Sequence, residues 1–226
     1  MCGRFTLTVD PSDLQMTLDL GELPPDLEPH YNIAPTQPVA VVVDPQSRRV
    51  EMYRWGLIPS WAKDPTIGNR LINARAETLE EKPAFRTAFK RRRCAVLTDG
   101  FFEWKRAENG KRVTKQPYHI QLADAQPFAF AGLWEIWKSP EGQDLHTCTI
   151  VTTEPNDLMA EIHNRMPAIL DKESMWDWLD PEASPISLHA LLQPYPADRM
   201  KAYPISTLVN RPENDRPDVI KPIDTK

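Results

Sequence analysis

The sequence predicts an α+β fold: a single domain with a mainly antiparallel β-sheet or barrel-like core and peripheral helices. Three observations lead to this class. Strand-like segments outnumber helical ones, and several alternate apolar with polar residues, as half-buried antiparallel strands do. The chain has 226 residues, a length that α+β folds reach as one unit. Because no repeat, low-complexity tract or linker divides the sequence, we expect one domain over residues 1–226.

The expected strands are short segments rich in β-branched, aromatic and aliphatic residues. They cover residues 38–44, 48–55, 94–98, 101–105, 118–123, 128–137 and 146–153. Four further segments carry helix signals: a capping Asp or Ser, a proline in the first turn, or aromatic residues four positions apart. They cover residues 11–20, 83–92, 171–179 and 184–193. The helices are therefore few and should lie around the sheet.

Proline is the unusual component of the sequence. There are 23 prolines, about twice the usual frequency of roughly 5%. They cluster in 23–29 and in 211–222, and because proline fixes φ and lacks a backbone donor, both stretches should be irregular. We therefore expect a proline-rich, irregular C-terminal arm over about residues 209–226.

Composition excludes several classes of protein. No apolar run approaches the roughly 18 residues of a membrane span, and the N-terminus lacks an apolar signal region, which favours the cytoplasm. The three cysteines, Cys2, Cys94 and Cys148, are too far apart for a zinc pattern and too few for a disulfide framework. We expect free thiols, no metal and no cofactor.

Charge is unevenly distributed along the chain. The net charge is −5, which argues against a surface that is positive throughout. Residues 1–115 contain 18 Lys and Arg against 15 Asp and Glu, whereas residues 116–226 contain 9 against 17. A surface for nucleic acid should therefore come mainly from the first half.

The second residue, Cys2, is the strongest candidate for chemistry. An initiator methionine before cysteine is normally removed, which would leave a free α-amine beside the thiol. The α-amine titrates near 7.7–8.0 and the thiol near 8.5, so both nucleophilic forms are populated near neutral pH. The amine can form a Schiff base with an aldehyde, and the thiolate can then close a five-membered thiazolidine ring. A cysteine at position 2 alone is more often incidental, although Gly3 allows close approach and Arg4 adds a fixed cation.

Two segments in the middle of the chain could complete a site. Asn73, Arg75 and Glu77 alternate, so on an extended chain they would face the same way and form a polar pocket; the alternative is a solvated strand face. Glu103 lies among Phe101, Phe102 and Trp104, surroundings that raise a carboxyl pKa toward that of a general acid. The alternative is that alternation points Glu103 to solvent.

Further candidates are a histidine, a basic run and two tryptophans. His163 stands in a polar patch with Asn164 and Arg165, although a lone histidine is more often structural. The run 85–93 predicts a helix that presents five cations, Arg86, Lys90, Arg91, Arg92 and Arg93, to phosphates. It could equally be a solvated face. Trp55 and Trp61 are candidates for stacking on bases or for the core.

Together these segments resemble the SRAP family, the SOS-response-associated peptidases, which are also known as abasic-site shield proteins. The matching segments are MCGRF at 1–5, YNIAPT at 31–36, WGLIPSW at 55–61, NARAET at 73–78, DGFFEWK at 99–105, HNRMP at 163–167 and a weaker YPIS with VN at 203–210. They occur in the family's order and span nearly the whole chain.

The resemblance implies a covalent activity on DNA. Cys2 would form a thiazolidine with the ring-opened sugar aldehyde of an abasic site in single-stranded DNA and so shield the lesion. It implies that Asn73 positions the amine and the sugar, that Glu103 is the general acid/base that opens the sugar ring, and that His163 assists proton transfer. Lyase activity and removal of its own N-terminal residue are further expectations.

The resemblance also implies the DNA contacts. It places Arg4 and Arg75 at the flanking phosphates. Separately from the resemblance, we expect Trp61, Arg86 and Arg165 to bind DNA as well. Phosphate contacts do not read sequence, so we expect specificity for the lesion, preference for unpaired DNA and for junctions with duplex, and a monomer associated with the nucleoid when bound to DNA.

Three alternative functions remain open at this stage. An N-terminal-nucleophile amidotransferase also begins Met-Cys-Gly, but it normally carries glutamine-binding motifs and a synthase domain that this chain lacks. A self-processing cysteine peptidase would use Cys2 and Glu103. A non-enzymatic single-strand binder would depend on the arginines alone and be indifferent to loss of Cys2.

Overall fold

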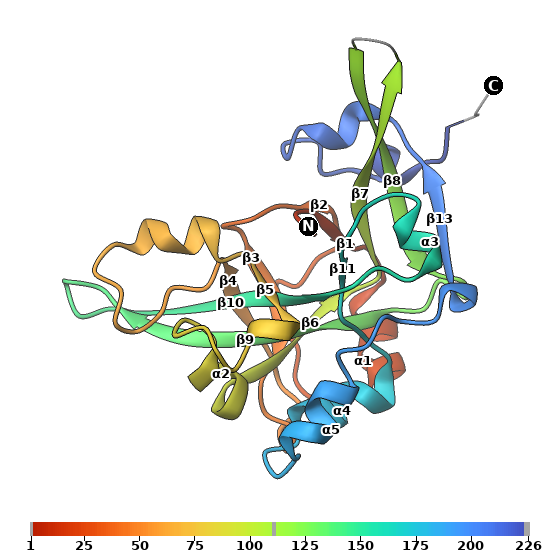
Figure 1. Ribbon diagram of the computed structural model, residues 1–226. Helices are drawn as coiled ribbons and strands as arrows, with labels where there is room; N and C mark the ends of the chain where they lie inside the picture. Colours follow the sequence, from red (N-terminus) through yellow and green to blue (C-terminus); the bar gives the residue numbers. More distant parts are fainter. Residues whose placement is uncertain (1, 110–111, 224–226) are drawn as a thin grey trace.

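The larger of the two β-sheets closes on itself. The computed structural model describes residues 2–109 and 112–223 (Figure 1). The ring consists of β3 (Pro38–Val42), β4 (Val50–Trp55), β6 (Arg93–Thr98), β9 (Phe128–Lys138) and β10 (Asp144–Thr153). Each strand pairs antiparallel with the next in the order β4–β3–β6–β9–β10, and β10 returns to β4 through a parallel pairing. The predicted barrel-like, mainly antiparallel core is therefore confirmed.

The barrel interior is filled by small and apolar side chains, as a narrow barrel requires. Cys94, Val96, Phe130 and Ile150 are all fully buried. A Cβ at Gly132 would lie 2.8 Å from Cys94 Sγ, so only glycine lets β9 approach its neighbours this closely. All three cysteines are buried and free, as expected.

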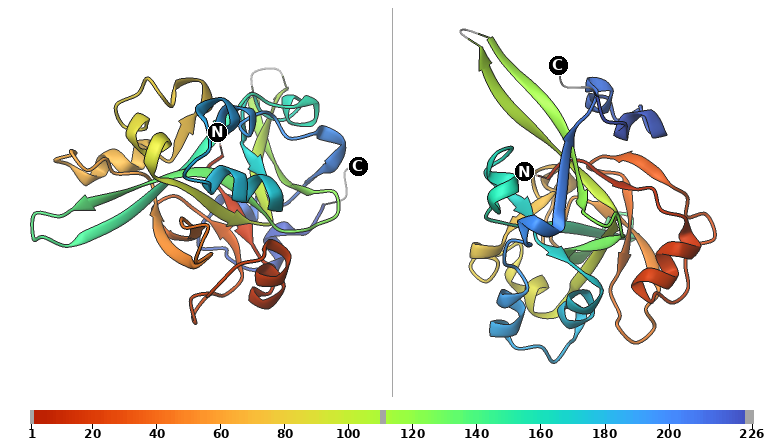
Figure 2. Two further views of the ribbon diagram at one scale, coloured as in Figure 1. Left: turned by 90° about the horizontal axis from the view of Figure 1, so that it is seen from below. Right: turned by 90° about the vertical axis from the view of Figure 1, so that its right-hand side faces the viewer.

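A second, antiparallel sheet packs against the barrel. Its order is β13–β8–β7–β1–β2, from β1 (Phe5–Leu7), β2 (His30–Ile33), β7 (Gly100–Asn109), β8 (Arg112–Leu122) and β13 (Met200–Pro204). Phe5 contacts Trp55 edge-on at 5.2 Å between ring centroids, and Phe101 contacts Phe130 at 5.9 Å. The two sheets thus share one apolar core. The β7–β8 hairpin projects well beyond it (Figures 1 and 2).

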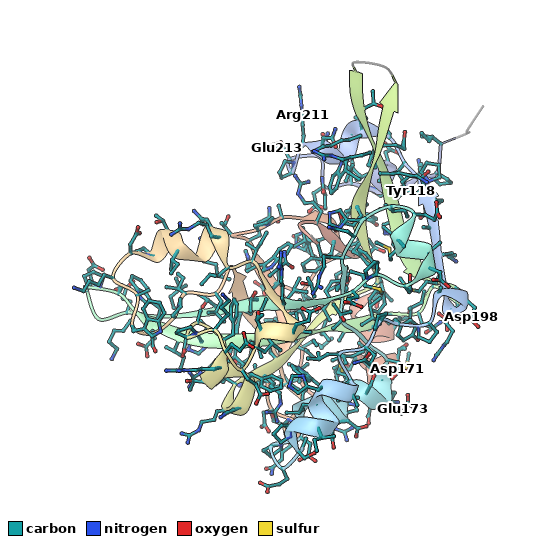
Figure 3. The ribbon with its side chains drawn as sticks, viewed as in Figure 1. Tyr118, Asp171, Glu173, Asp198, Arg211 and Glu213 are labelled. Carbon is teal, nitrogen blue, oxygen red and sulfur yellow. The ribbon has the colours of Figure 1, made fainter. Side chains whose placement is uncertain are left out.

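The helices are peripheral, as predicted. They are α1 (Pro11–Leu18), α2 (Arg86–Arg91), α3 (Asp157–Ala160), α4 (Lys172–Leu179) and α5 (Pro185–Ala190). Asp171 and Ser184 cap α4 and α5 as expected, and Asp171 lies at the start of α4 in Figure 3. The helix predicted over 83–92 begins only at Arg86, because Pro83 lies in a turn. Within the described residues, no helix is long and apolar enough to cross a bilayer.

Short elements complete the chain. Three are brief strands beside the barrel, β5 (Asn73–Arg75), β11 (Met166–Pro167) and β12 (Ile169–Leu170), and five are 3-10 turns, η1 (Pro65–Arg70), η2 (Ala76–Thr78), η3 (Ala197–Arg199), η4 (Thr207–Asn210) and η5 (Pro217–Ile220). Residues 23–29 form an irregular loop, as predicted. The C-terminal arm is less irregular than predicted, because Val209 and Val219 are fully buried against Phe102. Residues 224–226 of that prediction lie outside the described part.

Candidate active site at the N-terminal cysteine

Cys2 lies three residues before the first residue of β1 and is fully buried. Its backbone carbonyl accepts a hydrogen bond of 2.8 Å from Asn73 Nδ2, and its Sγ lies 3.9 Å from the carbonyl oxygen of Arg4. Strand β1 is paired on both sides, with β2 and with β7. The position of the thiol is therefore fixed by the second sheet on one side and by β5 on the other.

Asn73 is positioned by the parallel pairing of β5 with β10, in which it stands opposite Ile150. The amide nitrogen contacts Cys2, whereas the amide oxygen, Oδ1, is buried and has no hydrogen-bond partner among the residues that the structure describes. A buried acceptor without a partner is costly in a folded protein. Because Asn73 Oδ1 lies beside Cys2, it can accept a hydrogen bond from a ligand or from the amine of Cys2.

Glu103 lies on the inner face of β7 and is only 3% exposed. The strand alternates here: Phe102 and Trp104 pack in the small cluster below the C-terminal arm, while Glu103 faces the same side as Phe101. His163, in the loop after α3, places Nε2 4.0 Å from Glu103 Oε2. The structure thus brings Glu103 and His163 together and excludes the solvent-facing alternative for Glu103.

Burial governs the protonation of this group of residues. Desolvation raises the pKa of the Glu103 carboxyl above its ordinary value, so its acid form persists to higher pH. Desolvation also raises the pKa of the Cys2 thiol strongly, and the nearby negative charge of Glu103 adds to that shift. In this buried position the sulfur is a neutral thiol near neutral pH, and a thiolate requires a proton acceptor.

Two separate clefts are lined by residues close to Cys2, one by Glu103 and the other by Asn73. The first, about 560 Å³ in volume, is lined by Glu103, His163 and Asn164 together with Lys105, Arg106 and Lys115. The second, about 540 Å³, is lined by Asn73 together with Trp61, Arg75, Lys82 and Phe85. In Figure 1, β1 lies between the β7–β8 hairpin and the segment that contains η1. Each cleft thus contains a residue that acts on Cys2: Asn73 through a hydrogen bond and Glu103 through its charge.

The predicted DNA-binding residues divide into two groups, of which the first is accessible. Trp61 is 60% exposed and lines the second cleft with Arg75, which is also exposed. Arg86 is exposed at the start of α2, next to Phe85, which lines the same cleft. These three side chains can meet a ligand without any rearrangement of the fold.

The second group, Arg165 and Arg4, is already engaged inside the protein. Arg165 forms a bidentate pair with Glu77 at 2.6 and 3.0 Å and donates to the carbonyl of Thr152. These hydrogen bonds lower the pKa of Glu77. The prediction that Asn73, Arg75 and Glu77 face the same way is therefore wrong for Glu77, because η2 turns its side chain toward Arg165.

Arg4 links the N-terminal strand to the C-terminal arm. Its guanidinium donates to Asn32 Oδ1 at 2.7 Å and to the carbonyls of Val209 and Asn210 at 2.8 and 3.3 Å. The Asn32 amide in turn donates to carbonyls of the same arm, those of Val209, Arg211 and Asn214. Figure 3 shows Arg211 and Glu213 on the outer turn of this arm. Arg4 thus has a structural task whatever else it contacts.

Part of the basic run is structural. Arg93 is 6% exposed and donates to the carbonyls of Phe89, Lys90, Trp178 and Asp180, and Arg92 pairs with Glu135 at 2.7 Å. The prediction that all five cations face phosphates is therefore wrong for these two. Trp55 is also a core residue, because it is fully buried and donates from Nε1 to the carbonyl of Ile72.

Sequence reasoning missed the cations of the first cleft. Lys105, Arg106 and Lys115 come from the two strands of the hairpin, and only the pairing of β7 with β8 brings them together. Lys105 could have been found, because it follows Glu103 at the spacing of two that places residues on one face of a strand. Asn32 lies in the YNIAPT segment at 31–36, but nothing in the sequence indicates that it binds the C-terminal arm.

Comparisons with known proteins agree across the whole chain. A family model described as SOS response associated peptidase (SRAP) matches residues 1–212. The chain is 48% identical over 225 residues to the abasic site processing protein YoqW of Bacillus subtilis strain 168, covering 98% of this chain and 99% of that one. It is 31% identical over 268 residues to the abasic site processing protein HMCES of Xenopus tropicalis, covering 99% of this chain and 78% of the relative.

Solved structures show the same architecture. The crystal structure of a protein from Bacteroides thetaiotaomicron superimposes with a TM-score of 0.86 at 28% identity, and covers 98% of this chain and 100% of its own. One from Bordetella bronchiseptica superimposes with a TM-score of 0.76 at 23% identity, over 91% of this chain. The closed barrel and the attached second sheet are therefore a shared fold.

Proposed function

Because the chain belongs to the SOS response associated peptidase (SRAP) family, we propose that it processes abasic sites in DNA, sensing the lesion and shielding it through a covalent bond to Cys2. Relatives that align over almost their whole length are named abasic site processing proteins. The observation that supports the covalent step is the cluster around Cys2: Asn73 contacts its carbonyl, Glu103 lies close enough for its charge to act on the thiol, and His163 lies beside Glu103.

The proposed reaction begins once Met1 has been removed. The free α-amine of Cys2 attacks the aldehyde carbon of the ring-opened deoxyribose and forms a carbinolamine, which loses water to give a Schiff base. The thiol then adds to the same carbon: a C–S bond forms, the C=N π electrons return to nitrogen, and the thiol proton moves to that nitrogen. One water leaves overall, and the product is a thiazolidine.

The proposed roles follow from burial and position. Glu103, with its raised pKa, donates a proton to the sugar ring oxygen and to the departing hydroxyl, and His163 exchanges that proton with solvent from its partly exposed position. Asn73 aligns Cys2 through its carbonyl, and Asn73 Oδ1 accepts a hydrogen bond from the amine or from a sugar hydroxyl. Because the buried Cys2 thiol resists ionisation, the amine attacks first and the sulfur closes the ring.

The proposed DNA contacts start from the second cleft. Arg75 and Arg86 neutralise phosphates of the strand, and Trp61 stacks on a base next to the lesion. Arg165 and Arg4 would contact phosphates only with the N–H groups that their internal partners leave available. We propose single-stranded DNA and its junctions with duplex as the substrate, a monomer as the working form, and the cytoplasm, at the nucleoid, as the place of action.

Intact mass spectrometry tests the covalent step. The protein is mixed with a single-stranded oligonucleotide that contains one abasic site, beside the same strand without the lesion. We expect an adduct at the combined mass less one water, only with the lesion, and none for Cys2→Ala. Cys2→Ser should give no stable adduct, because an oxygen ring forms less readily, and a stable adduct in that variant would contradict thiazolidine formation.

The same spectra separate the remaining activities. The mass of the free protein shows whether Met1 has been removed, and retention of Met1 would exclude both amine-first capture and self-processing. Cleavage of the oligonucleotide beside the lesion would reveal the lyase activity that we also propose. If a correctly processed Cys2 forms no adduct, a non-covalent strand binder becomes the better description.

A further inference from the structure

Two cations stand directly opposite each other on the β7–β8 hairpin. Arg106 of β7 is the cross-strand partner of Lys115 of β8, and both side chains are exposed. Like charges in this relation destabilise a sheet. Among the described residues neither one has an ion-pair partner, whereas their neighbour Lys105 lies 3.6 Å from Glu161. The Arg106–Lys115 pair therefore does not stabilise the hairpin.

The same pair lines the first cleft, together with Glu103 and His163. Arg106 follows Glu103 by three residues, about 10 Å along a strand, and so belongs to the alternate set of β7 that contains Trp104; Trp104 also lines this cleft, which residues of both sets therefore reach. The two cations are thus near enough to Glu103 for the nucleotide next to a lesion to reach them. They line a different cleft from Arg75 and Trp61.

A DNA strand that passes Cys2 must leave it on both sides. The second cleft offers Arg75 and Lys82 to one flank of the strand, and the first cleft offers Arg106 and Lys115 to the other. In a chain with a net charge of −5, paired cations beside a candidate reaction centre that form no ion pair with any described side chain favour a polyanion as the ligand.

We propose that the first cleft binds the backbone phosphates of the DNA strand on one flank of the lesion, and that Arg106 and Lys115 are its phosphate contacts. This inference rests on the proposed function, since it assigns a partner to the same site. The hairpin then acts as a guide for the strand, and the contacts carry no sequence preference.

Charge reversal at one position separates binding from folding. Lys115→Glu turns the repulsive cross-strand pair into an attractive one, so we expect the Tm to stay the same or to rise by about 1–3 °C, while the affinity for single-stranded DNA falls. If both the affinity and the Tm of Lys115→Glu fall, the double variant Arg106→Gln/Lys115→Gln separates a loss of DNA contacts from unfolding, because it removes the repulsion without adding an acid. Unchanged affinity in that neutral variant overturns the proposal.

Truncated oligonucleotides locate the contact. Affinity is measured in a Cys2→Ala background for strands with a tetrahydrofuran abasic analogue in the middle, at the 5′ end or at the 3′ end. With Arg106→Glu/Lys115→Glu we expect about tenfold weaker binding of the central strand, a salt slope smaller by about 1.4, and a comparable loss for only one of the two terminal strands. The control is Lys138→Glu/Lys172→Glu, the same charge change on other elements.

The outcomes keep this inference apart from the proposed function. Equal losses for both terminal strands, or the same loss in the control variant, would mean a general effect of charge and overturn the assignment of the cleft. Cross-linking by the unmodified protein is followed separately with an abasic strand. If that reaction fails while the hairpin variant still binds one flank poorly, the covalent function is wrong and the strand-binding cleft stands.

Discussion

Glu103 lies in surroundings that favour an uncharged carboxyl group. It is 3% exposed, and burial raises its pKa. The proposed mechanism needs the acid form of Glu103 and the free-base form of the Cys2 amine at once. The rate of cross-linking should therefore rise with pH as the amine loses its proton and fall again as Glu103 ionises above its raised pKa.

Glu103→Gln tests this role. We expect the cross-linking rate to drop by about 10²-fold and the falling limb of the pH profile to disappear, while the affinity for an abasic-analogue strand changes less than about threefold. Single-turnover rates and equilibrium binding are measured on the same preparation. Parallel losses in rate and affinity would show that Glu103 is structural.

A second buried residue, His119, gives a pH effect on stability. It is 2% exposed, its Nδ1 lies 2.9 Å from the Tyr203 hydroxyl, and burial lowers its pKa to about 4, with Asp99 opposing and Lys201 adding to the shift. Below about pH 6.5 the unfolded chain takes up this proton and the folded protein does not. Stability is therefore complete above that pH and falls between about 6.5 and 4, by about 3 kcal/mol in all.

Urea unfolding at pH 7.5 and pH 5 measures this effect. The drop in unfolding free energy should shrink clearly in His119→Gln, which carries no titrating ring, and should persist in His30→Gln, whose histidine is half exposed. An unchanged pH dependence in His119→Gln would refute the assignment.

The residues of the site show what sequence can and cannot reveal. Cys2, Asn73, Glu103 and His163 were proposed from residue type and from recurring segments, and the structure places them together, although their roles remain predictions. The surroundings of Arg4 and Arg93 could not be predicted. From sequence alone an arginine is expected to be an exposed cation, because its burial depends on carbonyls far away in the chain, such as that of Val209 for Arg4.

At the scale of elements, the sequence predicts helix starts better than short strands. The helices α1, α4 and α5 begin at or beside the predicted residues, because a capping side chain and a first-turn proline act within one turn. Strands β1, β2 and β13 were not predicted. They are three to five residues long, too short for a clear alternation, and they exist because of partners distant in sequence.

Asn32 is the residue that attaches the C-terminal arm to β2. It is 1% exposed, accepts from Arg4, and donates to three carbonyls of the arm. Asn32→Ala would leave these groups without partners in a buried place, so we expect a loss of about 2–4 kcal/mol in unfolding free energy. We also expect faster amide hydrogen exchange in residues 206–223.

A matched control is His30→Ala on the same strand, which removes an exposed contact to Asp215 of the arm. It should cost less than about 1 kcal/mol. An Asn32→Ala protein whose arm exchanges as slowly as that of the parent would show that the apolar contacts of Val209 and Val219 alone retain it.

The molecule as a whole should unfold in one step. Phe5 and Phe101 of the second sheet lie in the same core cluster as Phe130 and Trp55 of the barrel, so neither sheet retains its core without the other. We propose that residues 1–226 form one domain, and we expect a single calorimetric transition with an enthalpy of about 160 kcal/mol near 60 °C. Two transitions, or a van't Hoff enthalpy well below the calorimetric one, would indicate separate units.

The strand edges of this chain are protected from self-association only once the barrel has closed. The ring is complete only when β10, residues 144–153, pairs with both β9 and β4. Until then β4 and β9 present open hydrogen-bonding edges, the kind of surface on which chains aggregate. A polypeptide still emerging from the ribosome, or one truncated before residue 144, would thus be prone to precipitate, and fragments of this protein should be recovered as inclusion bodies rather than as smaller working units.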